Sequence, residues 1–174
     1  MTITEDATIL ETCAAYWQEQ RKMCDALEQI ADSLPDAIDR KVCLHAARAL
    51  PTLMARTHRY EEEVLFVALD RPGLTPFNPR PTLSRLKLEH AGDECFAEEL
   101  SEVLFSYAEG RPTHSAEATG YMLRGFFEAL RRHIAIEEEL STALSEDDPI
   151  KRTQAHSRVA GYPEARAAGF PGLF

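Results

Sequence analysis

The sequence predicts an all-α fold, an antiparallel up-down four-helix bundle followed by a C-terminal extension. Apolar residues recur at intervals of three and four over four long segments, which is the period of an amphipathic helix. The segments are joined by short connections or by connections rich in proline, as between neighbouring helices of a bundle. No stretch alternates every second residue between turns, so we expect no strands.

The first helix is expected from about Thr4 to Ser33, with Gln20 as the one polar residue of its inward stripe. That stripe consists of Leu10, Cys13, Trp17, Gln20, Cys24, Leu27, Ala31 and Leu34. Pro35 ends this helix and can open the next, because proline is tolerated in a first helical turn. The second helix should reach about Leu69, and Pro51 could kink it by removing a backbone hydrogen bond. Its inward stripe consists of Met54, His58, Glu62, Leu65 and Leu69.

A loop rich in proline, from Asp70 to Pro81, separates the two halves of the predicted bundle. The third helix is expected over about Thr82 to Ala108, and its inward stripe consists of Leu83, Leu86, His90, Glu94, Ala97 and Leu104. The fourth is expected over about Ser115 to Leu144, and its inward stripe consists of Leu123, Phe126, Leu130, His133, Glu137, Leu140 and Leu144.

These elements assign residues 1–148 to the bundle and residues 149–174 to a tail. The tail has scattered prolines and glycines and no long stripe, so it should contain a short helical piece at most. Its aromatic side chains could dock it on the bundle or on a second subunit.

Length and charge bound the class of protein. A chain of 174 residues is long enough for one sizeable core. The net charge of -10 argues against nucleic acids and anionic membranes as partners, because both are bound by clustered cations. No apolar run is long enough to span a membrane, and the first twenty residues do not resemble a signal peptide. We therefore expect a cytoplasmic protein, and the sequence identifies no protein partner.

Three of the six histidines have a glutamate four residues later, where chance would give about 0.7 such pairs. This spacing places an imidazole and a carboxylate one turn apart on one helix face, so a pair can bind one metal ion. A metal ion would also offset the cost of burying a carboxylate among apolar residues. The pairs are His58 with Glu62, His90 with Glu94, and His133 with Glu137. The remaining histidines lack such an acid and are expected on the surface or in the tail: His45, His114 and His156.

Three segments resemble the metal-binding stations of hemerythrin-like (HHE cation-binding) domains. Residues 58–66 (HRYEEEVLF) and 133–140 (HIAIEEEL) are similar to the family's second-helix and fourth-helix motifs, and residues 86–90 (LKLEH) to its third-helix motif. The resemblance covers about residues 8–147.

The resemblance implies a non-haem di-iron centre bridged by Glu62 and Glu137. One iron would be bound by His90, His133 and Glu94, and the other by His58. Zinc or manganese would accept much of the same ligand set.

Gln20 occupies the position where the family's first helix usually has a histidine. An amide oxygen is a poorer iron ligand than imidazole. Gln20 could ligate through its oxygen, water could take its place, or one site could be partly empty so that the protein binds a single metal. Gln20 could also be an ordinary hydrogen-bonded core residue.

Two classes of function are compatible with such a centre. A binding protein would bind or sense O2, NO or peroxide, or handle iron, whereas an enzyme would be a di-iron oxidase or would remove peroxide. Binding or sensing is favoured over an enzyme, because the sequence shows no general acid or organic-cofactor motif near the predicted centre. A third possibility is that the glutamates lie at the edges of their stripes in water, in which case the chain is a metal-free interaction bundle.

Overall fold

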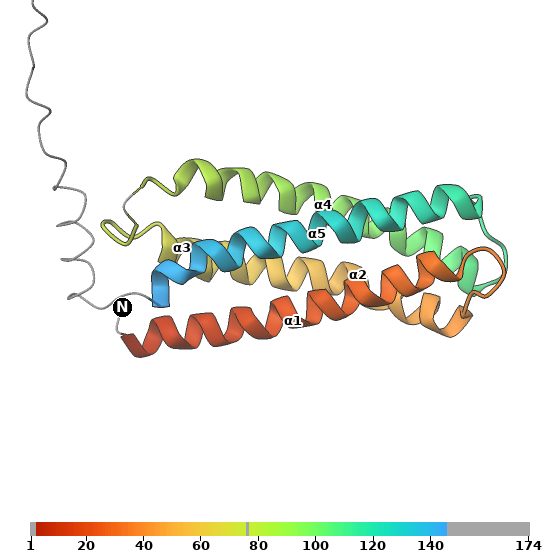
Figure 1. Ribbon diagram of the computed structural model, residues 1–174, viewed down its shortest axis with the longest axis horizontal. Helices are drawn as coiled ribbons and strands as arrows, with labels where there is room; N and C mark the ends of the chain where they lie inside the picture. The colour runs from red at the N-terminus through yellow and green to blue at the C-terminus, as the bar shows by residue number, and fades with distance from the viewer. Residues whose placement is uncertain (1–2, 76, 146–174) are drawn as a thin grey trace, which may run out of the picture.

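Four long helical rods lie side by side and alternate in direction, which confirms the predicted antiparallel bundle (Figure 1). The computed structural model describes residues 3–75 and 77–145. The rods are α1 (Ile3–Ser33), the continuous run α2 (Arg40–Tyr60), η1 (Glu61–Leu65) and α3 (Phe66–Leu69), then α4 (Arg80–Ala108) and α5 (Ala116–Ser145). The predicted tail, residues 149–174, lies outside the described residues.

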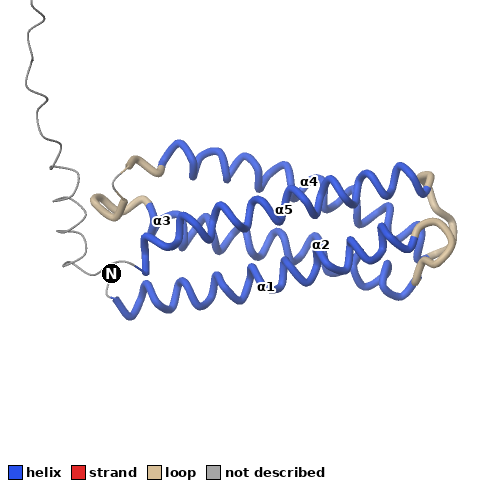
Figure 2. The backbone as a smooth tube through the Cα atoms, viewed as in Figure 1, coloured by secondary structure: helices blue, strands red, loops and turns tan. Residues whose placement is uncertain are grey.

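The most extensive helix contacts join α2 to α4 and α1 to α5. The connections lie at the two ends of the bundle and leave its middle entirely helical (Figure 2). The core is filled by large apolar side chains from all four rods, including Leu27, Leu50, Leu86, Leu100, Leu104, Leu123, Phe126 and Leu130. Any site in the middle of this apolar core is therefore formed by side chains of the helices. No helix among the described residues combines the length and the apolar run needed to cross a membrane.

The second rod begins later than the proline signal suggested. Pro35 lies in the turn after α1, and α2 starts at Arg40. Asp39 caps this helix, because its Oδ1 accepts hydrogen bonds from the backbone N–H groups of Lys41 (2.8 Å) and Val42 (3.4 Å). Pro51 lies within α2, and the departure from regular α-helix is the π-helical segment η1.

A partly buried ion pair ties α1 to the loop after α3. Arg71 Nη2 lies 2.8 Å from Asp6 Oδ2, and Arg71 Nε donates to the backbone oxygen of Ala68 at 2.8 Å. The Asp6 side chain is only 4% exposed, so among the described residues its charge depends on Arg71.

Arg71→Met should therefore destabilise the fold by about 2 kcal/mol, because it leaves the Asp6 carboxylate buried without its partner. The measurement is the urea midpoint of unfolding. Arg80→Met is the matched control, since Arg80 makes a similar pair with Asp70 but is 71% exposed, and its midpoint should not change. Equal losses in the two variants would contradict the importance of burial here.

Candidate metal centre

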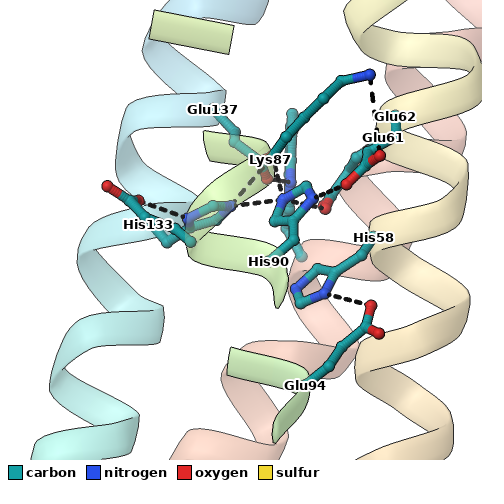
Figure 3. A network of polar contacts seen from close by, with 10 residues as sticks. His58, Glu61, Glu62, Lys87, His90, Glu94, His133 and Glu137 are labelled. Atoms are coloured by element: carbon teal, nitrogen blue, oxygen red, sulfur yellow. Dashed lines mark hydrogen bonds and ion pairs between the residues drawn. The ribbon is translucent and has the colours of Figure 1, made fainter. Parts of the chain in front are cut away.

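Three histidines and two glutamates from three rods converge in the middle of the bundle (Figure 3). His58 comes from the end of α2, Glu61 from η1 and His90 from α4, whereas His133 and Glu137 come from α5. Each of the five is at most 2% exposed. One ligand atom from each of Glu61, His90, His133 and Glu137 can be chosen so that all four lie within 4.8 Å of one another. This arrangement is a buried His/Glu cluster that can hold a metal ion.

The Nε2 atoms of His90 and His133 are the centre of this cluster, 3.0 Å apart. His133 Nε2 lies 3.3 Å from Glu137 Oε1, and His90 Nε2 lies 3.4 Å from Glu61 Oε2. Two nitrogens bound to one ion at about 2.1 Å and at right angles to each other would also lie about 3.0 Å apart. The spacing of the imidazoles therefore fits two ligands of a single ion.

The opposite nitrogen of each ring faces a carboxylate on the outside of the cluster. The Nδ1 atoms lie 2.9–3.1 Å from carboxylate oxygens in three pairs: His58 with Glu94, His90 with Glu62, and His133 with Glu89. An ionised carboxylate can only accept, so each Nδ1 carries the hydrogen and donates it. In the neutral ring the inward Nε2 then carries a lone pair, and this tautomer can bind a metal ion through Nε2.

Such a set of acceptors favours a cation at its centre. With Nδ1 protonated, Nε2 of His90 and Nε2 of His133 are two acceptors facing each other, and the oxygens of Glu61 and Glu137 are acceptors as well. Acceptors brought together in a buried space repel one another unless a proton or a metal ion lies between them.

In the absence of metal, protons must fill this role. Burial raises the pKa of Glu61 to about 10, and the charge of Glu137 adds to the rise. Burial also acts to raise the pKa of Glu137. Where the inward Nε2 atoms carry hydrogens in the metal-free protein, the hydrogen bonds that His133 and His90 donate to Glu137 outweigh burial and bring that pKa to about 2. Burial lowers the pKa of His58 to about 3, so this ring is neutral at physiological pH. A metal ion would displace the Glu61 proton.

Glu61, rather than the expected Glu62, lies in the inner layer. The Glu62 side chain is 34% exposed and reaches His90 from outside the cluster, whereas Glu61 is fully buried. Residues three and four positions after His58 are both neighbours of its face, so spacing could not choose between them. Glu61 begins the π-helical turn, in which the N–H of Phe66 bonds to the oxygen of Glu61 five residues earlier.

Glu94 also differs from its expected position beside His90. Its side chain is 43% exposed and is paired with His58 on the facing rod. Of the three predicted pairs, only His133 and Glu137 lie against each other in the cluster, at 3.3 Å. Exposed positions for His45 and His114 agree with the prediction for them, and His156 lies outside the described residues.

Gln20 is fully buried, and both its amide atoms lack a hydrogen-bond partner among the described residues. The same is true of His58 Nε2, of both Glu61 oxygens and of Glu137 Oε1. An unpartnered buried polar atom costs about 1–3 kcal/mol, so the concentration of such atoms on His58, Glu61 and Glu137 indicates a bound group. The donors are imidazole nitrogens and carboxylate or amide oxygens, which suit iron, zinc and manganese.

Three residues of the centre were not found from the sequence. Trp17 was expected only as core, but its Nε1 donates to Glu137 Oε2 at 3.0 Å and orients that carboxylate. Glu89 on α4 contacts His133 on α5, and spacing along one helix cannot predict a contact between two helices. Glu61 carried a usable signal, because Met54, His58, Glu61 and Leu65 also follow a three-four alternation.

The chain matches the family model of the hemerythrin HHE cation binding domain over residues 8–143. The match includes every residue of the buried cluster and reaches from within α1 to within α5. Comparisons with curated proteins and with solved structures find no match. With most of its length matched by one family model, the chain belongs to the hemerythrin HHE cation-binding domain family.

Proposed function

We propose that the buried cluster holds non-haem iron, as a di-iron centre, and that the protein binds or senses O2, NO or peroxide or handles iron. The observation that carries this proposal is the pair of imidazole nitrogens, His90 Nε2 and His133 Nε2, that lie 3.0 Å apart between two buried carboxylates. That arrangement is costly for a purely structural core and is relieved by a metal ion.

The first iron would be held by the four-residue set of Glu61, His90, His133 and Glu137. A second position would use His58 and Gln20, whose unpartnered buried atoms are not explained by the first. The His58 ring stacks on the His90 ring, with 4.0 Å between centroids, so this donor lies beside the first set. Both Glu61 oxygens are unpartnered among the described residues and could serve a shared ion, whereas Glu137 Oε2 accepts the hydrogen bond from Trp17.

Iron in such a site supplies an open coordination position at which a small ligand can bind. The chain's own contribution is to bury the ligand side chains within the bundle. His58 and His90 line the inner side of a cleft of about 460 Å³ between α2 and α4, so a ligand of a few atoms can approach the buried rings from this side. We infer binding or sensing rather than catalysis. The imidazoles of His58 and His90, which line this cleft, are already hydrogen-bonded to the carboxylates of Glu94 and Glu62, so these groups are engaged in holding one another.

The test is iron content followed by ligand binding. Protein expressed with added iron should contain about two iron atoms per chain. The anaerobic ferrous protein should form a stable nitrosyl spectrum with NO and should consume peroxide only stoichiometrically. Repeated turnover of peroxide would replace the binding proposal by an enzyme, and absence of a transition metal would overturn both in favour of a metal-free bundle.

A further inference from the structure

We propose that Glu62, Glu89 and Glu94 are positioning residues that hold one imidazole each from outside the centre, and that Glu62 and Glu94 do not bind metal. This inference rests on the proposed function and assigns the acids around that site.

The three outer carboxylates each reach a histidine on a different rod. Glu62 on η1 contacts His90 on α4, and Glu94 on α4 contacts His58 on α2. Each of these two neighbouring rods therefore supplies a carboxylate that holds a histidine of the other. Glu89 on α4 holds the ring of His133 on α5. These reciprocal hydrogen bonds fix both the orientation of the rings and the spacing of the helices. A ring cannot turn without breaking its hydrogen bond to a carboxylate on the neighbouring rod.

Exposure separates the outer acids from the inner ones. The side chains of Glu62, Glu89 and Glu94 are 34–43% exposed, so their charges are solvated and need no metal ion. Two of them also face cations, since Lys87 Nζ lies 3.8 Å from Glu62 and Arg85 Nε lies 3.2 Å from Glu89. The inner acids, Glu61 and Glu137, are 0% exposed and have oxygens without a hydrogen-bond partner within residues 3–75 and 77–145.

A carboxylate that accepts from Nδ1–H acts on the metal through the ring. It fixes the tautomer with the lone pair on Nε2, and its negative charge makes Nε2 a stronger donor. Loss of such a partner typically weakens metal affinity by about 10- to 100-fold while the ligands remain in place.

Three consecutive glutamates allow a matched test, because Glu61 is buried, Glu62 is outside the centre and Glu63 is exposed. Fe(II) affinity is measured anaerobically by competition with a chelator for Glu61→Gln, Glu62→Gln and Glu63→Gln. We expect Glu61→Gln to lose most of its iron, Glu62→Gln to keep the wild-type stoichiometry with about 10- to 100-fold weaker affinity, and Glu63→Gln to match the wild type.

Two further readouts separate positioning from a general structural effect. Co(II) bound to Glu62→Gln should show a shifted visible absorption band, because a neutral amide accepts the Nδ1 hydrogen bond without the charge. Glu62→Leu should weaken Fe(II) binding further than Glu62→Gln, since it also loses the hydrogen bond. Fluorescence of Trp17, the one tryptophan of the chain, checks that each variant is folded.

The outcomes distinguish this inference from the proposed function. If wild type binds iron but Glu62→Gln loses it while Glu61→Gln keeps it, Glu62 is the ligand and the inference is overturned. Equal affinity of Glu62→Gln and Glu63→Gln would also overturn it. Failure of the wild-type protein itself to bind iron would instead remove the proposed function.

Discussion

His133→Ala is expected to abolish iron binding, leaving less than about a tenth of the wild-type iron content after purification. His133 provides the Nε2 atom that faces both His90 Nε2 and Glu137 Oε1, so its removal takes away one ligand and the neighbour of two others. Of the four ligand residues, only Glu61, His90 and Glu137 would remain, too few to bind the ion tightly. Iron content per chain, measured by elemental analysis, is the readout.

His45→Ala is the control for this loss. His45 is also a helical histidine, but it lies exposed on α2 and away from the cluster, so its iron content should equal that of the wild type. A His133→Ala protein that is folded and retains full iron would show that the iron is bound elsewhere.

Glu61→Met is expected to stabilise the metal-free protein by about 2 kcal/mol while it prevents iron from doing so. The Glu61 carboxyl group is fully buried, and neither of its oxygens has a hydrogen-bond partner in the part of the chain that the structure describes. Its raised pKa means that it takes up a proton on folding, which costs free energy at neutral pH. A methionine of similar volume removes this cost and packs against the apolar core.

Urea unfolding with and without Fe(II) tests this pair of effects. Wild-type protein should gain about 2.7 kcal/mol or more when free Fe(II) exceeds the dissociation constant 100-fold, and Glu61→Met should gain little. Glu63→Met, on the exposed side of the same run, should behave as wild type in both conditions. If Glu61→Met destabilised the metal-free protein, the buried Glu61 carboxyl group would be stabilising the fold, which would contradict this prediction.

The fold was predictable because its main signal is repeated along each rod. The three-four alternation of apolar residues fixed which face of each helix is buried, and the four rods follow it closely. One helix start was less predictable: Pro35 and Asp39 are both typical of helix starts, and the side-chain cap of Asp39 prevailed.

The interior positions of His58, His90, His133 and Gln20 followed from the same alternation, because each lies in an apolar stripe. The choice between Glu61 and Glu62 did not, since both are neighbours of the His58 face and differ only in a local π turn. The pairing of Glu94 with His58 and of Glu89 with His133 depends on how rods meet in space, which spacing along one rod cannot encode.

The most direct test of the central claim is a crystal structure of protein grown with iron, with anomalous scattering measured at the iron absorption edge. We expect an anomalous peak enclosed by Glu61, His90, His133 and Glu137, with Glu62 and Glu94 hydrogen-bonded to Nδ1 atoms outside it. A peak bound to the carboxylates of Glu62 or Glu94, or an iron-loaded protein with no peak at the buried cluster, would contradict it.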